Sequence, residues 1–329
     1  MLRIFWGLAL ALVLAPVARA EETVTVQLVK STAQAPYYIA VGKGYFEKEG
    51  LKIDAGETRS ALDTIAPLAQ GRLDASLGAA TAGFFNAAHR GFDLRIVAAL
   101  GIQGPVMATQ PLVRKALWDD GTIKSAKDLR GRKVAINAPG DITEYFLTLM
   151  LEKYGMTTKD VDLTPLGFGE QIAAFKNGAI DAGFLPEPVA TATKLTGSVV
   201  LLEPEAGVGE GTITTYVFAG LHFLNDRPKV AQAFLRALVR GARDAQGAYS
   251  KNPEIAAMIA REAGIAPAAV EQATPYVIDP NLDITKYEAG LHREEAVLRK
   301  NGRLTYDEPL DFTKVIDARP IHEAAASIK

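Results

Sequence analysis

One short block of sequence occurs twice in this chain, and the two copies align without a gap. The copies are IAPLAQGRLDA at 65–75 and IAAFKNGAIDA at 172–182, so a constant 107 residues separates equivalent positions. This spacing is too long for stacked repeats of roughly 20 to 50 residues, and it is about the size of a small domain. The duplication therefore predicts two domains of similar construction.

Short β-rich runs alternate with helical segments around both copies, which favours parallel sheets with helices on their faces. The segment 36–50 is expected as one helix that ends at a glycine. A further β-rich run covers 213–224, and the chain after it is almost wholly helical. The expected strands are 24–30, 51–57, 73–80 and 93–100 in the first series, and 133–138, 161–168, 180–185 and 198–204 in the second.

Two crossings, near residues 101–108 and 211–218, suggest that the middle of the chain is inserted into the first domain. We therefore predict that residues 21–105 and 217–329 form one domain, with a helical C-terminal part, and that residues 106–216 form the other. The expected fold class is α/β. Each domain is predicted to be a mostly parallel sheet flanked by helices, and two crossover strands join the domains.

The first twenty residues have the pattern of a cleaved secretory signal peptide. A positive residue is followed by an apolar run from Ile4 to about Pro16 and then by Ala18-Arg19-Ala20. Cleavage after Ala20 would leave 309 residues. The chain has no cysteine, which excludes the lipidated cysteine of an exported lipoprotein. We expect an unlipidated protein in a Gram-negative periplasm.

Composition and motifs exclude several function classes. Without the signal, 34 basic and 38 acidic residues remain, so nothing predicts nucleic-acid binding. The absence of cysteine removes disulfides, thiolate metal sites and cysteine nucleophiles. The four histidines are scattered, and neither a phosphate-binding loop nor a G-x-S-x-G elbow occurs. We therefore predict no metal, no cofactor and no enzymatic activity.

Candidate binding residues were sought where predicted strands give way to helices. Ligands of open α/β sheets bind outside the carboxyl ends of the strands, where helix N-termini point. Equivalent positions in the repeat place Thr81 and the neighbourhood of Glu187 at facing edges of the two domains. The candidates are Gln34, Tyr37, Thr58, Arg59, Ser60, Ala80 and Thr81 in the first domain, and Gly140, Asp141, Thr143, Phe168 and Glu187 in the second.

Most of these candidates also have a structural interpretation. Arg59 suits a carboxylate, sulfonate or phosphonate, but a loop arginine is commonly only solvated. Asp141 and Glu144 form a D-x-x-E pattern that a capping box explains, while Gly140 would let the backbone approach a ligand. Glu187 would accept from an amine or hydroxyl, or would simply favour a helix N-terminus.

The aromatic candidates and two aspartates also have structural interpretations. Tyr37 and Tyr38 are adjacent on one helix, so one is expected in the core and the other at the cleft. Core packing is the default for Phe168 as well. Asp74 and Asp181, at equivalent points of the repeat, precede strands and are expected to be structural.

Four segments together resemble the nitrate/sulfonate/taurine-type substrate-binding proteins of ABC transporters, which are related to the thiamine-precursor-synthase-like domain. The resemblance covers roughly residues 24–204. The segments are PYYIAVGKGYFEKEGLKI at 36–53, ALDTIAPLAQGRLDASLG at 61–78, DLRGRKVAI at 128–136, and LEKYGMTTKDVDLTPLGFGEQIAAFKNGAIDAGFLPEPVA at 151–190.

The resemblance implies a two-lobe, type II-like periplasmic binding protein fold. Such a receptor captures a small solute in the cleft by hinge closure and passes it to an ABC permease with its ATPase. We expect a monomer. The family's cleft contacts fall on Tyr37, 59–61, 80–81, 140–143 and Glu187.

The ligand and the rival functions stay open at this point. A small organic anion is expected, a sulfonate first and a carboxylate second, with nitrate also in the family. An amine-bearing or pyrimidine-like ligand would instead use Glu187 and stacking on Tyr37 or Phe168. The rivals are a ligand-sensing subunit and a pyrimidine-related enzyme. Pyrimidine synthases of the family use a cysteine-rich motif, and this chain has no cysteine.

Overall fold

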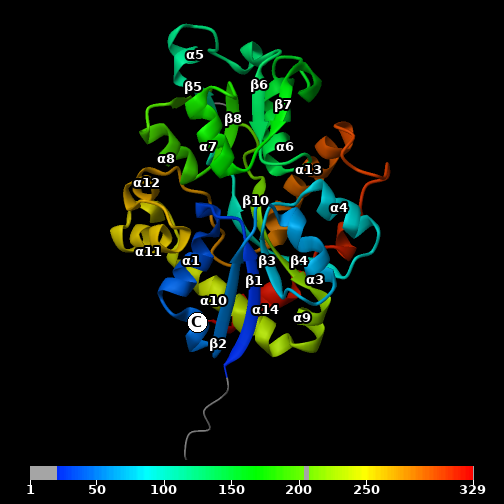
Figure 1. The fold of residues 1–329 in the computed structure, drawn as a ribbon. Helices are drawn as coiled ribbons and strands as arrows, with labels where there is room; N and C mark the ends of the chain where they lie inside the picture. Colours follow the sequence, from blue (N-terminus) through cyan, green and yellow to red (C-terminus); the bar gives the residue numbers. More distant parts are fainter. Residues whose placement is uncertain (1–20, 204–206, 329) are drawn as a thin grey trace, which may run out of the picture.

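The computed structural model of the chain describes residues 21–203 and 207–328. The predicted signal peptide, residues 1–20, lies outside the described residues. Two five-stranded sheets stand one above the other (Figure 1). Within the described ranges, no helix combines the length and the apolar character needed to cross a bilayer.

The first sheet has the strand order β2-β1-β3-β10-β4. Its strands are β1 (Glu22–Leu28), β2 (Leu51–Glu57), β3 (Ala75–Gly78), β4 (Leu94–Ile102) and β10 (Ile213–Gly220). β1 pairs in parallel with β2 and β3, whereas β10 runs antiparallel to both β3 and β4. β10 therefore returns the chain to this sheet from a distant part of the sequence.

The second sheet repeats the pattern, with the order β7-β6-β8-β5-β9. Its strands are β5 (Thr109–Arg114), β6 (Lys133–Ile136), β7 (Asp162–Pro165), β8 (Ala182–Pro186) and β9 (Val199–Leu201). β6 pairs in parallel with β7 and β8, and β5 is the antiparallel member. The predicted α/β architecture is confirmed. Each sheet is mixed and contains one reversed strand, which is β10 beside β3 in the first sheet and β5 beside β8 in the second.

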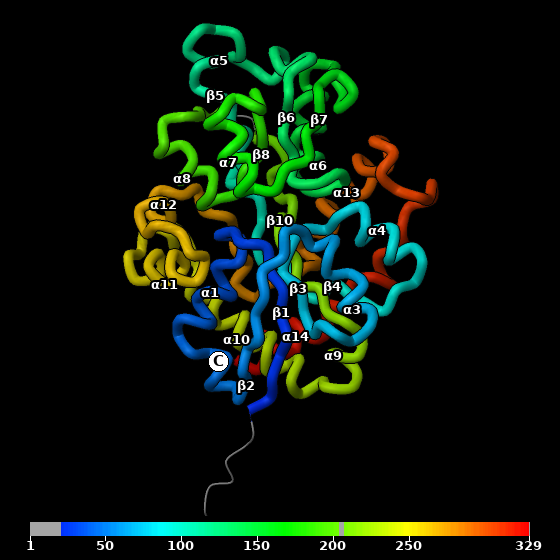
Figure 2. The backbone as a smooth tube through the Cα atoms, viewed as in Figure 1, coloured from blue at the N-terminus to red at the C-terminus, as the bar shows by residue number. Residues whose placement is uncertain are grey.

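The chain passes between the sheets after β4 and again before β10 (Figure 2). We call the first sheet with α1 to α4 the first lobe, and the second sheet with α5 to α8 the second lobe. The predicted domain boundaries themselves stay a prediction. These helices are α1 (Ala35–Gly42), α2 (Tyr45–Lys48), α3 (Ile65–Ala69), α4 (Ala82–His89), α5 (Lys115–Asp119), α6 (Ile142–Glu152), α7 (Phe168–Asn177) and α8 (Val189–Leu195).

Six helices follow β10, and four of them begin with proline at one of their first two positions, where its missing N–H costs nothing. α10 and α14 pack beneath the first sheet and belong with the first lobe, while α13 reaches α6 of the second lobe. Both ends of the described chain lie in the first lobe, at the end remote from the second sheet (Figure 1). The helices are α9 (Leu221–Asp226), α10 (Pro228–Asp244), α11 (Pro253–Ala263), α12 (Pro267–Gln272), α13 (Glu288–Lys300) and α14 (Arg319–Ser327).

Two glycines change the expected element boundaries. The helix expected over 36–50 breaks into α1 and α2 because Gly44 adopts a left-handed φ of 63°, which a helix cannot continue through. The β-rich run expected over 213–224 ends at Gly220, which caps α9. Both departures shorten an element and leave the topology as predicted.

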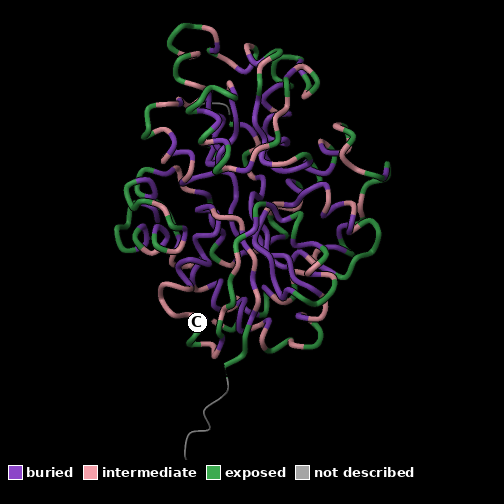
Figure 3. The backbone as a smooth tube through the Cα atoms, in the orientation of Figure 1, coloured by how far each residue is buried: buried purple, intermediate pink, exposed green. Residues whose placement is uncertain are grey.

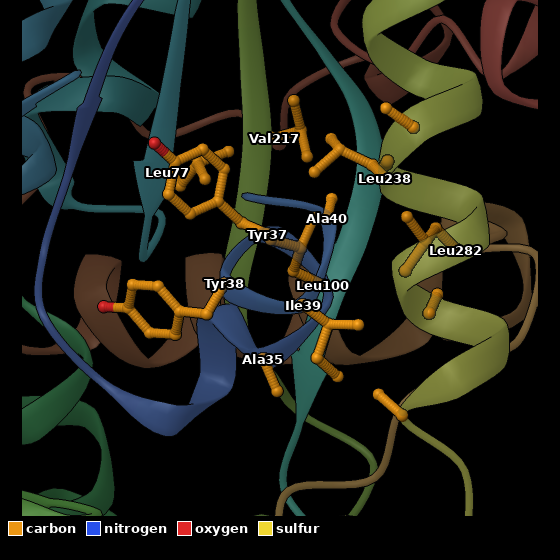
Figure 4. Close-up of a cluster of buried hydrophobic side chains, with 14 of the residues drawn as sticks. Ala35, Tyr37, Tyr38, Ile39, Ala40, Leu77, Leu100, Val217, Leu238 and Leu282 are labelled. Carbon is orange, nitrogen blue, oxygen red and sulfur yellow. The ribbon is translucent and has the colours of Figure 1, made fainter. Parts of the chain in front are cut away.

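The core of the first lobe holds both tyrosines of α1. Tyr37 and Tyr38, which Figure 4 shows among the buried side chains, are 4% and 1% exposed. The Tyr37 ring lies 5.7 Å from that of Phe46. The sequence assigned one of the two to the cleft. Because α1 is covered by α10 and α11 as well as by the sheet, both of its sides are buried. Tyr37 and Tyr38 are therefore packing residues.

The two copies of the repeat end in the same way, each with an aspartate directly before a strand. Asp74 immediately precedes β3, where it accepts from Thr25 and Arg227. Asp181 precedes β8, where it accepts from Arg114 and the Lys133 N–H. Both aspartates stabilise the starts of strands, at the end of each sheet that is remote from the other lobe.

Candidate functional site

An inner cavity is lined by residues of both lobes. The backbone that continues from one sheet to the other is largely buried (Figure 3). The volume of the cavity is about 40 Å³, whereas a single water needs at least about 10–15 Å³. Both lobes contribute to its walls. The polar residues that line it are Ser31, Gln34, Thr214 and Thr215 from the first lobe, Thr109, Asn137, Asp141 and Thr143 from the second, and Tyr276 from the segment after α12.

A wider outer vestibule of about 480 Å³ adjoins this cavity. The two spaces share Val29, Asn137 and Phe168 in their linings. The vestibule wall is largely apolar on the side of the second lobe and of α11, where Ile172, Val189 and Ile265 meet. The remaining members are Lys30, Glu57, Thr58, Arg59, Gly167, Gly169, Glu170 and Ala263.

Asn137 occupies the junction of the two spaces, directly after β6 ends at Ile136. Its Nδ2 donates to the Arg59 carbonyl and to Asp141 Oδ2, each at 3.2 Å. Both partners are acceptors, so the amide must point its nitrogen toward them. The Oδ1 of Asn137 therefore has no donor among the described residues.

Asp141 caps α6 and lines the inner cavity. Its Oδ1 accepts from the Thr143 N–H at 3.0 Å and from the Thr143 hydroxyl at 3.2 Å. Burial raises the pKa of Asp141, although its hydrogen bonds act in the opposite direction. Among the described residues Oδ2 accepts only from the Asn137 amide, so it has room for a second donor. The capping role predicted for Asp141 is present together with exposure to the cavity.

Other side chains cap the neighbouring helix starts. Ser31 accepts from Ala33 N, Ser60 from Leu62 N, Thr81 from Phe84 N and Glu170 from Gly167 N. The sequence had offered these N-termini as sites for an anion. In the structure, protein oxygens already occupy these N–H groups, and an anion would have to replace them.

The two lobes also contact each other around the cavity. Arg59 pairs with Glu170 of α7 at 3.1 Å, and both side chains are mostly exposed. The Ala82 N–H at the start of α4 donates to the Gly140 carbonyl at 2.7 Å. Gly140 has a left-handed φ of 72°, and a Cβ there would lie 2.4 Å from that of Ala82. Gly140 thus allows close approach, as predicted, but to the facing helix.

A buried ion pair strengthens this junction. Glu144 of α6 is fully buried and accepts from Arg303 Nε at 2.9 and 3.0 Å and from the Gly140 N–H at 2.7 Å. The Arg303 carbonyl in turn accepts from Asn86 of α4. The segment after α13 therefore connects the first lobe to α6. The capping role predicted for Glu144 is present in a shifted form. Its carboxylate accepts from the N–H of Gly140, which lies one residue before the N-cap, Asp141.

Glu187 is buried, and protein donors surround its carboxylate. Oε1 accepts from Gln110 Nε2, the Thr191 hydroxyl and the Thr274 N–H, while Oε2 accepts from the Thr191 N–H. Burial raises its pKa. Its carbonyl accepts from the Thr32 N–H at 2.8 Å, which is another contact between the lobes. The carboxylate that was expected to meet a ligand binds the protein instead.

The predicted residues thus separate into three groups. Gln34, Asp141, Thr143 and Phe168 line the inner cavity, and Thr58 and Arg59 join Phe168 in the outer vestibule. The rest support the walls: Ser60 and Thr81 as caps, Ala80 and Tyr37 in cores, and Gly140 and Glu187 in contacts between the lobes.

Sequence reasoning missed several lining residues. Asn137 lay inside the strand expected over 133–138, whereas β6 ends at Ile136 and leaves Asn137 at the strand end. Ser31 follows an expected strand, so the same rule could have found it, but Thr109 begins β5, a strand that was not expected. Thr215 and Tyr276 carry no local signal, because β10 and the segment after α12 reach the cavity only through the tertiary fold.

Comparisons with known proteins agree with this architecture. Residues 31–254 match the family model described as NMT1/THI5 like. The chain is 26% identical over 247 residues to the taurine-binding periplasmic protein of Escherichia coli (strain K12), an alignment that covers 74% of this chain and 72% of that protein. It is also 26% identical over 224 residues to the 4-amino-5-hydroxymethyl-2-methylpyrimidine phosphate synthase of Aspergillus parasiticus, covering 63% and 61% respectively.

A similar solved structure is the alkanesulfonate-binding protein SsuA from Xanthomonas axonopodis pv. citri bound to MOPS. Its TM-score is 0.72 at 21% identity, and the match covers 91% of this chain and 99% of that one. Similarity at this level of identity concerns the fold. It supports the two-lobe arrangement seen here.

Proposed function

Because the chain belongs to the NMT1/THI5-like family, we propose that it is the solute receptor of an ABC import system, which captures a small organic solute between its lobes. The observation that carries this proposal is the inner cavity lined from both lobes. A solute that contacts both lobes favours the closed arrangement by its differential affinity. The proposed partners are a permease and its ATPase, and the proposed compartment is the periplasm.

The names of the relatives make sulfonates the first compounds to test, with carboxylates and nitrate after them. No Lys, Arg or His is among the described residues that line the inner cavity. A sulfonate would therefore rely on hydroxyl and backbone groups. For this reason the receptor function is proposed without fixing the charge of the solute.

A thermal-shift screen of the chain from residue 21 onward tests this function. A solute that binds only the folded protein adds about 2.7 kcal/mol at 100 times its dissociation constant. The panel contains sulfonates, carboxylates, nitrate, amines, amides and pyrimidines. A hit recovered chemically unchanged after incubation supports a receptor, whereas its conversion would favour an enzyme like the synthase relative.

Gly169→Trp provides the control for binding in the cleft. A Cβ at Gly169 would meet no atom within 4 Å, so the backbone there tolerates a side chain. An indole at this position would fill the outer vestibule. We expect the variant to fold and to lose the shift. A hit that still stabilises it fully would place binding outside the cleft, and no hit from the whole panel would refute the receptor function.

A further inference from the structure

The polar groups around the inner cavity can be sorted into donors and acceptors. Asn137 Oδ1 has no donor among the described residues, and its orientation is fixed by two acceptors on Nδ2. Asp141 Oδ2 has one donor and room for another. The Thr215 hydroxyl and the Gln34 amide can act in either sense. The side chains whose sense is fixed therefore offer acceptors to a ligand.

The charges near the cavity also favour a hydrogen-bond donor or a cation over an anion. The two basic side chains of the outer vestibule are each paired, Arg59 with Glu170 at 3.1 Å and Lys30 with Glu57 at 3.0 Å. At the start of α6, Glu144 is neutralised by Arg303, which leaves Asp141 without a basic partner among the described residues. An anion would meet Asp141 as a like charge in a buried space, whereas a cationic donor would meet an opposite charge.

The shapes of the two spaces favour a ligand with a small head group and a larger apolar body. A volume of about 40 Å³ admits a group of a few heavy atoms. Phe168 belongs to both linings, and Ile172, Val189 and Ile265 continue the wall outward into the vestibule. A planar or aliphatic body bound against these side chains would place its head at Asn137 and Asp141.

We propose that the site selects an amphipathic solute with a hydrogen-bond-donating head, cationic or neutral, held by Asn137 and Asp141, and an apolar body that packs on Phe168. This inference rests on the receptor function proposed above and adds the chemical class of its solute. Asn137 is the residue that reads the head, because its Nδ2 is committed to two protein acceptors and its carbonyl oxygen is left for a ligand. Asp141 sets the preference for charge.

Three compounds of nearly equal shape test this: benzamidine, benzamide and benzoate carry a cationic, a neutral and an anionic head on the same ring. We expect benzamidine and benzamide to stabilise the protein in thermal shift and to bind in calorimetry, and benzoate to bind at least about tenfold more weakly than benzamidine. Taurine and benzenesulfonate are measured beside them as anion-bearing references.

Asp141→Asn is the decisive variant, because asparagine caps helices as well as aspartate does and removes the charge. It should weaken benzamidine binding about tenfold and improve benzoate. Asn137→Leu, which removes the acceptor, should weaken both benzamidine and benzamide. Thr285→Val, at an exposed residue of the turn before α13 that lines neither space, should change none of them.

The outcomes separate this inference from the receptor function. If benzenesulfonate, taurine or benzoate stabilises the protein while benzamidine and benzamide do not, the inference is overturned and the receptor function stands. The same holds if Asp141→Asn leaves the order of the three heads unchanged. If no compound of either panel binds, both proposals are refuted.

Discussion

The buried pair of Glu144 and Arg303 allows a quantitative prediction about the junction of the lobes. Glu144 is 0% exposed and Arg303 is 32% exposed, so water screens the pair weakly. Two Nε contacts at 2.9 and 3.0 Å join them, and the Gly140 N–H completes the shell around the carboxylate. Removing one partner leaves the other charge buried and uncompensated, which costs 3–5 kcal/mol as a rule.

We expect Arg303→Ala to reduce the free energy of unfolding by about 3 kcal/mol, at the lower end of that range because Arg303 is partly exposed. Glu144→Gln should cost a similar amount. Its amide oxygen can still accept from the Gly140 N–H, so the double variant should lose only about 4 kcal/mol. The coupling energy in a double-mutant cycle would then be about 2 kcal/mol.

Urea unfolding followed by far-ultraviolet circular dichroism measures all four proteins. Lys300→Ala provides the control, because Lys300 at the end of α13 pairs with Glu152 at the end of α6, and these side chains are 63% and 35% exposed. That variant should lose less than about 1 kcal/mol. A coupling energy below about 0.5 kcal/mol for Glu144 and Arg303 would show that the pair behaves like a surface ion pair, and the reasoning from burial would be refuted.

Three further predictions follow from single contacts. Burial raises the pKa of Glu294 in the folded protein well above its ordinary value. The protonated side chain therefore costs no stability below the pKa of the unfolded state, and stability is lost as pH rises from there toward the pKa of the folded state. Glu294→Gln should therefore match the wild type near pH 4 and exceed its stability by pH 7, by about 1.4 kcal/mol per pH unit in which only the unfolded state is ionised; equal urea midpoints at pH 7 would contradict this. Gly140→Ala should lower the melting temperature, because the new Cβ meets Ala82 at 2.4 Å and φ is 72°; an unchanged melt would show that the lobes do not meet there in solution. Arg59→Ala breaks only the exposed pair with Glu170, so we expect less than about a threefold change in the affinity for any solute found by the screen, and a larger loss in calorimetry would return Arg59 to the binding site.

The architecture could be predicted from the sequence because its signals are local. Alternation of strands and helices predicted the parallel strands of both sheets but missed the antiparallel strand β5. The repeat placed Asp74 and Asp181 at equivalent strand starts. The helix over 36–50 was too long because the left-handed turn at Gly44 depends on one dihedral angle that composition does not encode.

The site could be predicted only in part, because strand ends indicate position and say little about direction. Asp141 and Phe168 lie at strand ends and line the cavity. Glu187 lies at a strand end too, but Gln110, Thr191 and Thr274 surround its carboxylate, and these partners come from three separate segments. Gln110 and Thr274 are far from Glu187 in the sequence, and such distant partners decide whether a polar side chain faces a ligand or the protein.

Both ends of the described chain lie in the first lobe, and this has a practical consequence for measuring closure. Dyes attached at the two termini would move together and would report nothing about the distance between the lobes. Immobilisation by either end, in contrast, leaves the second lobe free to move over a surface. A distance sensor should therefore pair one label near a terminus with another at an exposed position of α5, such as Ala116, at the far end of the second lobe (Figure 1).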